Sequence, residues 1–191
     1  MSKSDCDRPI SLPLPSRHER ILSAIKCFDG WGYSRNDVQY PWAIPGVDLF
    51  VVPVTGAKGV TNCCCFVEAV VLRAYDVQEW GLERHNCSML VDARRPYSTV
   101  EVLEDAGLTM ATENAGRTGV PRWYAVQGWR GGLVDIPQCG GHTFLVEAWP
   151  GEAMVTMHEA NVSTGVHSLS TTWRTINKRY PSNKIVRLRD T

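Results

Sequence analysis

The chain has 191 residues, of which 43% are hydrophobic and 21% charged, and its 20 basic and 20 acidic residues give no formal net charge. This composition is ordinary for one globular domain with a real core, and the balanced charge argues against a nucleic-acid partner or an anionic membrane surface. No stretch approaches the roughly 18 apolar residues of a membrane span.

The first half of the chain is expected to be mainly helical. Residues 1–15 are polar and proline-punctuated, so we expect a flexible arm without a Sec signal on a protein made in the cytoplasm. Residues 16–191 are expected to form a single domain. Ser16 followed three residues later by Glu19 is a capping box, which predicts a helix over residues 17–28. The glycine- and tryptophan-rich stretch that follows is typical of an ordered loop, and residues 49–54 have the composition of a short strand.

Strands are expected to dominate the second half. A further capping box predicts a short helix closed by Gly107, and residues 122–129 have strand composition. Two apolar stretches, 141–149 and 152–160, flank Pro150-Gly151, a strong signal for a hairpin. Thr171 or Thr172 can cap a helix through residue 179, and residues 184–189 are typical of a last strand. Together these elements predict an α+β fold.

Three adjacent cysteines open a helix with a buried apolar face, predicted over residues 63–75. Thr61 or Asn62 can cap it, which puts Cys63 in the first turn. The positive end of the helix dipole favours thiolate over thiol there. Packing is the usual role of a buried cysteine, but three consecutive residues cannot all face a core. Seven cysteines, three of them adjacent, do not resemble a disulfide framework and indicate folding in a reducing compartment.

Two histidines are expected at the same end of the predicted hairpin. His142 begins the first strand and His158 is near the end of the second. A histidine near a thiolate, held by a second polar group, is the arrangement of nucleophilic catalysis. We therefore expect His142 to be the base and His158 to orient it. A structural role is the alternative for each histidine, and the other candidates for the third position are Glu159, Asn161 and His167.

Three short blocks resemble the NlpC family of bacterial cell-wall peptidases. The block Asn62-Cys63-Cys64-Cys65-Phe66-Val67 is similar to the start of the family's catalytic helix. Gly141-His142-Thr143-Phe144 is similar to its histidine strand, and Met157-His158-Glu159-Ala160-Asn161 to the strand that follows. The resemblance implies a papain-like fold with the catalytic helix packed on an antiparallel sheet. It also implies Cys63 as nucleophile, His142 as base and His158 as orienting residue.

The chain also departs from that family's pattern. Cys64-Cys65 replaces a Ser-Gly pair, and His142 follows Cys63 by 79 positions. The long spacing predicts an insertion at about residues 76–121. In this respect the chain resembles the amidase effectors of bacterial type VI secretion. That likeness implies export by a type VI or other non-classical route, with an immunity or carrier protein as partner.

The function implied is a cysteine amidase or endopeptidase. The resemblance implies a peptidoglycan stem peptide as substrate, of the D-glutamyl–diaminopimelate type. The alternatives are a protease or deamidase acting on a protein, and an inactive papain-like binding module, which the Cys64-Cys65 pair favours. A zinc site of Cys63, Cys65 and His142 would need an unusual geometry, because neighbouring residues point apart and no Cys-x-x-Cys pair exists. No metal or other cofactor is therefore expected.

Overall fold

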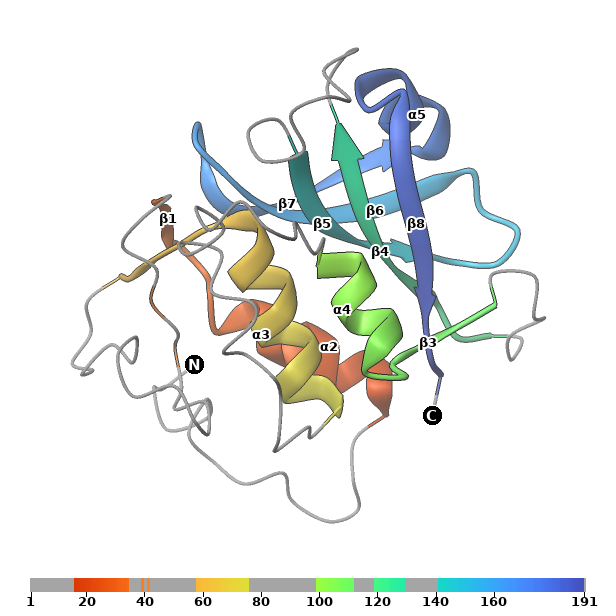
Figure 1. Cartoon of the computed structure of the whole chain (residues 1–191), viewed down its shortest axis with the longest axis horizontal. Coiled ribbons are helices and arrows are strands. Elements are labelled where there is room, and N and C mark those ends of the chain that lie inside the picture. The colour runs from red at the N-terminus through yellow and green to blue at the C-terminus, as the bar shows by residue number, and fades with distance from the viewer. Residues whose placement is uncertain are drawn as a thin grey trace. The chain divides into compact units, whose positions relative to one another are not determined.

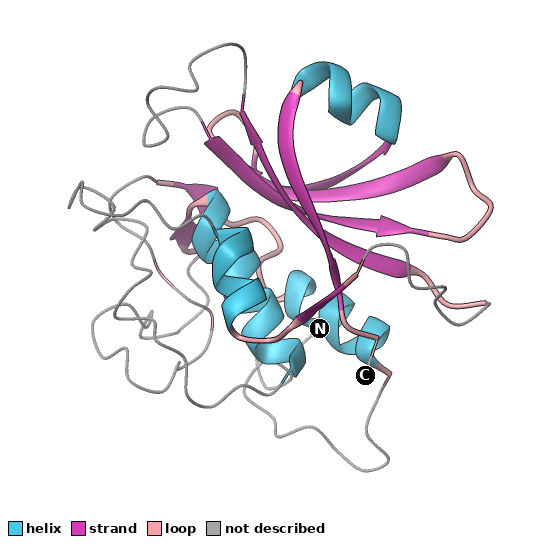
Figure 2. Cartoon of the chain, turned by 45° about the vertical axis from the view of Figure 1, so that its right-hand side comes forward, coloured by secondary structure: helices cyan, strands magenta, loops and turns pink. Residues whose placement is uncertain are grey.

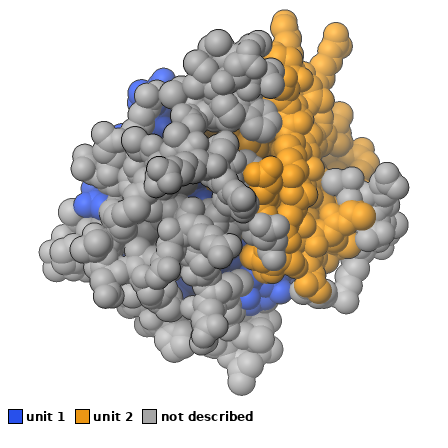
Figure 3. All heavy atoms as spheres, viewed as in Figure 1, with its two compact units in different colours: residues 1–88, 160–167 blue, residues 89–159, 168–191 orange. Residues whose placement is uncertain are grey.

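The computed structural model describes residues 16–34, 39, 41, 58–75, 99–111, 119–129 and 141–190. The chain divides into two compact units, which Figure 3 shows in different colours. Unit 1 comprises residues 1–88 and 160–167, and unit 2 comprises residues 89–159 and 168–191. Helices and an antiparallel sheet are both present, so the fold is mixed α+β. The expected arm at 1–15, the strand at 49–54 and most of the expected insertion at 76–121 lie outside the described residues.

Unit 1 contains two helices, α2 (Arg17–Lys26) and α3 (Cys63–Tyr75), and a short parallel pair of strands, β1 (Gly32–Tyr33) and β2 (Val60–Thr61) (Figure 1). The capping box at the start of α2 is confirmed. The Ser16 hydroxyl accepts a hydrogen bond from the Glu19 amide, and the Glu19 carboxylate accepts one from the Ser16 amide. Phe28, just after α2, makes edge-on contacts with the rings of Trp31 and Phe66, and the second of these joins it to α3.

The helix α3 begins and ends where its sequence predicts. Apolar residues lie all round it and nearly all its side chains are buried, which is typical of a buried helix. The Asn62 side chain caps it, because its Oδ1 accepts a hydrogen bond from the Cys65 amide at 2.9 Å. At the other end, Arg17 of α2 donates to the Ala74 carbonyl at 2.8 Å and lies over the Tyr75 ring. This cation suits the negative end of the helix dipole.

Residues 160–167 join unit 1 through the backbone. The Val166 amide donates to the Trp31 carbonyl at 2.9 Å. Gly165, with φ of 69°, lies directly against the same carbonyl, and a Cβ built there would be 2.1 Å from the oxygen. A glycine is therefore required at this contact.

Unit 2 is built on the sheet (Figure 2). The strand order is β3-β8-β4-β5-β6-β7, and the pairs β3–β8, β8–β4, β4–β5 and β5–β6 are antiparallel. The elements are α4 (Thr99–Asp105), β3 (Thr109–Met110), β4 (Arg122–Trp129), β5 (Gly141–Ala148), β6 (Met154–Asn161), β7 (Gly165–Thr172), α5 (Trp173–Arg179) and β8 (Ser182–Leu188).

The predicted hairpin is confirmed, and its register decides which side chains share a face. Gly151 adopts a φ of 86° in the turn between β5 and β6. Phe144 pairs with Glu159, and Leu145 pairs with His158. Directly paired residues project to the same side of a sheet, and successive residues project to opposite sides. Glu159 therefore shares the face of Phe144, and His158 lies on the other face.

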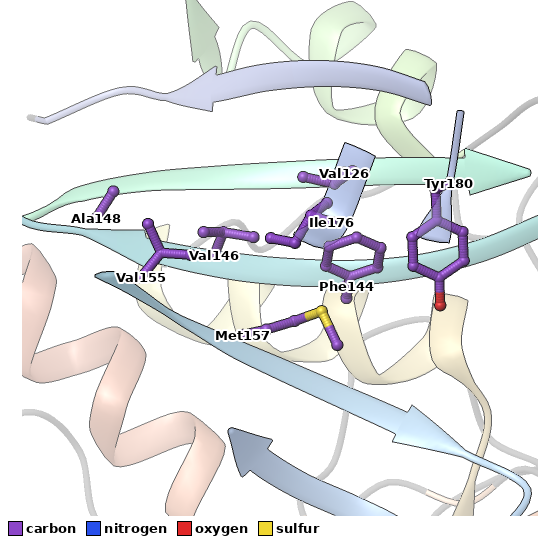
Figure 4. Close-up of a cluster of buried hydrophobic side chains, with 8 residues drawn as sticks. All are labelled: Val126, Phe144, Val146, Ala148, Val155, Met157, Ile176 and Tyr180. Atoms are coloured by element: carbon purple, nitrogen blue, oxygen red, sulfur yellow. The ribbon is translucent and has the colours of Figure 1, made fainter. Parts of the chain in front are cut away.

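The core on the Phe144 side of the sheet is a cluster of buried hydrophobic side chains (Figure 4). Thr172 caps α5, since its hydroxyl accepts a hydrogen bond from the Thr175 amide, as the sequence predicts. Strand residues meet Ile176 of this helix and Tyr180 just after it. The buried cluster comprises Val126, Phe144, Val146, Ala148, Val155, Met157, Ile176 and Tyr180. Among the helices in the described ranges, none is long and apolar enough to cross a membrane.

Candidate functional site

Cys63 is the first residue of α3 in unit 1 and is buried. The cap supplied by Asn62 fixes where the helix begins, so the thiol lies in the first turn, at the positive end of the helix dipole. First-turn amides have no partner within their own helix, and such amides are suited to bind a developing negative charge. The position is therefore favourable for a nucleophilic thiolate.

The neighbouring thiols are close to Cys63. Its Sγ is 3.9 Å from that of Cys64, and Cys63, Cys64 and Cys65 are all reduced. Cys65 is buried while Cys64 is partly exposed. Cys27 is disulfide-bonded, so the cysteines are not uniformly reduced.

In unit 2, His142 is bonded to Glu159. The imidazole Nε2 donates to the Glu159 carboxylate, which is 1% exposed, while the histidine side chain is 14% exposed. In the neutral ring this contact puts the proton on Nε2, so Nδ1 carries the lone pair that can accept a proton. A buried carboxylate also stabilises the imidazolium form. The bond to Glu159 thus fixes the orientation of the His142 ring.

Residues at the end of α5 support this pair. Arg179 Nη1 lies 3.7 Å from the second carboxylate oxygen of Glu159. The ring of Tyr180 stacks on His142 at 5.9 Å between centroids and packs against the backbone of Gly128. A Cβ at Gly128 would lie 2.6 Å from that ring. The imidazole is therefore oriented by a carboxylate and by an aromatic ring.

The expectation that His158 orients His142 must be corrected. His158 pairs with Leu145 and lies on the opposite face of the sheet from Glu159. Its Nδ1 is 2.7 Å from the Ser168 hydroxyl, and its ring stacks on Trp123. The reason is the alternation of the strand, which sends neighbouring side chains to opposite faces.

The other two candidates for the third position lie in unit 1. The side chain of Asn161 accepts hydrogen bonds from two backbone amides and so closes the turn between β6 and β7. The ring of His167 is hydrogen-bonded to the Thr164 hydroxyl at 2.7 Å. These contacts of Asn161 and His167 are local to the turn. Of the candidates for the third position, Glu159 is the one that is hydrogen-bonded to His142.

The sequence contained a signal for Glu159. A tight turn at Pro150-Gly151 pairs even-numbered residues of one strand with odd-numbered residues of the other. That parity places Glu159, and not His158, on the face of His142, and the observed register has the same parity. No cluster of three or more His, Cys, Asp or Glu side chains suited to a metal ion occurs in the described part of the chain.

Comparison with protein-family models, with curated proteins and with solved structures finds no match to this chain. The site residues and the motif resemblance are therefore what support a function.

Proposed function

We propose that the chain is a papain-like cysteine hydrolase that cleaves an amide bond. Cys63 is the nucleophile and His142 the general base. Glu159 takes the orienting role that the motif resemblance assigned to His158. The observation that carries the proposal is the bond from His142 Nε2 to the buried carboxylate of Glu159, because a base oriented by a third group is the signature of nucleophilic catalysis.

The reaction requires the Cys63 thiol to transfer its proton to Nδ1 of His142. The thiolate attacks the amide carbonyl, and first-turn amides of α3 stabilise the oxyanion. The imidazolium then protonates the departing amine, and water hydrolyses the thioester to regenerate the thiol. Glu159 stabilises the imidazolium throughout, and Asn62 holds the start of the helix in place.

The substrate class comes from the motif resemblance. A peptide amide is the general expectation, and a peptidoglycan stem peptide of the D-glutamyl–diaminopimelate type is the first candidate. Export by a type VI or other non-classical route, with an immunity or carrier protein as partner, belongs to the same proposal.

The first test is the rate of iodoacetamide labelling from pH 5 to pH 9, with peptide mapping to separate Cys63 from Cys64 and Cys65. Wild type, His142→Ala and Glu159→Gln are compared. We expect Cys63 to label rapidly near pH 6, where an ordinary thiol is almost wholly protonated. His142→Ala is expected to abolish this rapid labelling, and Glu159→Gln to reduce it.

The matched control is His167→Ala, which removes a histidine beside the β6–β7 turn and is expected to leave the pH profile of Cys63 unchanged. Labelling of Cys63 no faster than that of Cys64 at every pH would overturn the enzyme proposal and favour the inactive binding module. A positive result is followed by digestion of muropeptides and of a denatured protein, with mass spectrometry of the products. Cleavage of protein alone would favour the protease alternative.

A further inference from the structure

Unit 2 contains a second cluster of nucleophilic and titratable side chains, on the other face of the sheet from His142. The hydroxyl oxygen of Ser168 on β7 lies 2.7 Å from Nδ1 of His158 on β6. On the other side of the same ring, Nε2 of His158 lies 3.8 Å from Oε2 of Glu147 on β5. Three neighbouring strands thus supply a hydroxyl, an imidazole and a carboxylate in line.

The order of these groups defines the proton positions. Nε2 of His158 has no hydrogen-bond partner among the described residues and faces the Glu147 carboxylate at 3.8 Å, so the attraction of that charge, rather than a hydrogen bond, favours the proton on Nε2. Nδ1 then carries the lone pair, and the Ser168 hydroxyl donates to it. A hydroxyl that donates to an oriented imidazole is an activated nucleophile.

The surroundings bury the His158 ring but leave Ser168 accessible to solvent. His158 is 4% exposed, and the Trp123 ring stacks on it at 5.3 Å between centroids. The Trp149 indole donates to Glu147 Oε1 at 3.0 Å, which holds the carboxylate in place. Ser168 is exposed. Low dielectric around the ring strengthens its interaction with the carboxylate.

We propose that Ser168 is an acyl-accepting nucleophile, a site separate from the cysteine chemistry proposed above. The serine Oγ bonds to the carbonyl carbon of an activated acyl donor, its proton moves to Nδ1 of His158, and the bond from carbon to the leaving group breaks. Glu147 stabilises the resulting imidazolium. The buried ring delivers no proton to a leaving group, so the donor class is an aryl ester or thioester, whose leaving group departs as an anion.

The test is site-specific acetylation by p-nitrophenyl acetate, followed by peptide mapping. Ser170 is the internal control, because it is an exposed serine on the same strand and lies two positions further along. All proteins carry Cys63→Ser, so that the result does not depend on the proposed cysteine hydrolase. Ser168 is expected to acetylate about 100-fold faster than Ser170, the lower end of what a positioned base contributes.

His158→Gln is expected to reduce acetylation of Ser168 to the rate of Ser170, and Glu147→Gln to reduce it in part. A second comparison uses urea in place of a substitution in the cluster. Unfolding separates Ser168 from His158, so we expect Ser168 and Ser170 to be acetylated at equal rates in urea. Ser168 acetylating no faster than Ser170 in the folded protein would overturn the proposal. Rapid acetylation that persists in His158→Gln would overturn the assigned base.

Discussion

The imidazole of His142 and the carboxylate of Glu159 are bonded across neighbouring strands, with the carboxylate almost completely removed from solvent. A buried charge of this kind is tolerated when it is paired and hydrogen-bonded, and removing one partner is costly. The pair is therefore expected to contribute to stability as well as to any catalysis.

Glu159→Gln is expected to lower the free energy of unfolding by about 1–3 kcal/mol, because it weakens a buried charged hydrogen bond without changing side-chain volume. Urea denaturation measures this change. The matched control is Glu152→Gln in the exposed β5–β6 turn, expected within about 0.5 kcal/mol of wild type. Equal effects at the two positions would contradict the assigned pairing.

Gly128→Ala tests the packing of Tyr180. The new Cβ would lie 2.6 Å from the tyrosine ring, and we expect a loss of about 1–3 kcal/mol from overpacking. Thermal unfolding measures the loss. In a double-mutant cycle with Tyr180→Leu the two losses are expected not to add, because the smaller side chain relieves the clash. Full additivity would show that the two residues do not share this contact.

Gly165→Ala and Gly151→Ala form a matched pair, since both positions have positive φ. No atom lies within 4 Å of a Cβ at Gly151, so only the backbone cost of about 1 kcal/mol is expected there. At Gly165 the Cβ meets the Trp31 carbonyl, and we expect a loss of about 3 kcal/mol or more. Urea denaturation of both variants isolates the contact, and similar losses would show that Gly165 does not lie against Trp31.

The capping box of α2 is expected to respond to acid. Hydrogen bonds from the Ser16 side chain and then from its backbone lower the pKa of Glu19 below its ordinary value. The contribution of Glu19 to the free energy of unfolding is therefore fully present above the pKa of about 4.3 that the residue has in the unfolded chain. This contribution is lost as the pH falls through the lower pKa of the folded state. Glu19→Gln should remove this part of the acid dependence, measured by far-ultraviolet circular dichroism between pH 2 and pH 6. An unchanged profile would contradict it.

Elements with local signals were predictable from the sequence. The cap of α2, the extent of α3, the β5–β6 hairpin and the Thr172 cap depend on residues a few positions apart. The strand β7 was missed because Ser168 and Ser170 interrupt any apolar alternation, and its place depends on pairing with β6. A strand without apolar alternation gives no two-residue period by which to recognise it in the sequence.

The residues of the candidate site also differ in how far local sequence predicts them. Cys63 at a helix start follows from the cap at Asn62, so its position was predictable. The partner of His142 depends on strand register, in which a difference of one position exchanges His158 for Glu159, and the only signal for it was the parity set by the turn at Pro150-Gly151. The cluster of Ser168, His158 and Glu147 draws one residue from each of three strands, and a single sequence offers no pattern that joins them.

The alternation along β6 has an evolutionary consequence. Because His158 and Glu159 are adjacent, two polar clusters on opposite faces of the sheet share one length of backbone. Point substitutions can alter one cluster while leaving the other intact. Insertion or deletion of a single codon within this strand would exchange the two faces and remove both clusters at once. We therefore expect homologues that retain either cluster to have insertions and deletions in the turns, while the length of β6 stays the same.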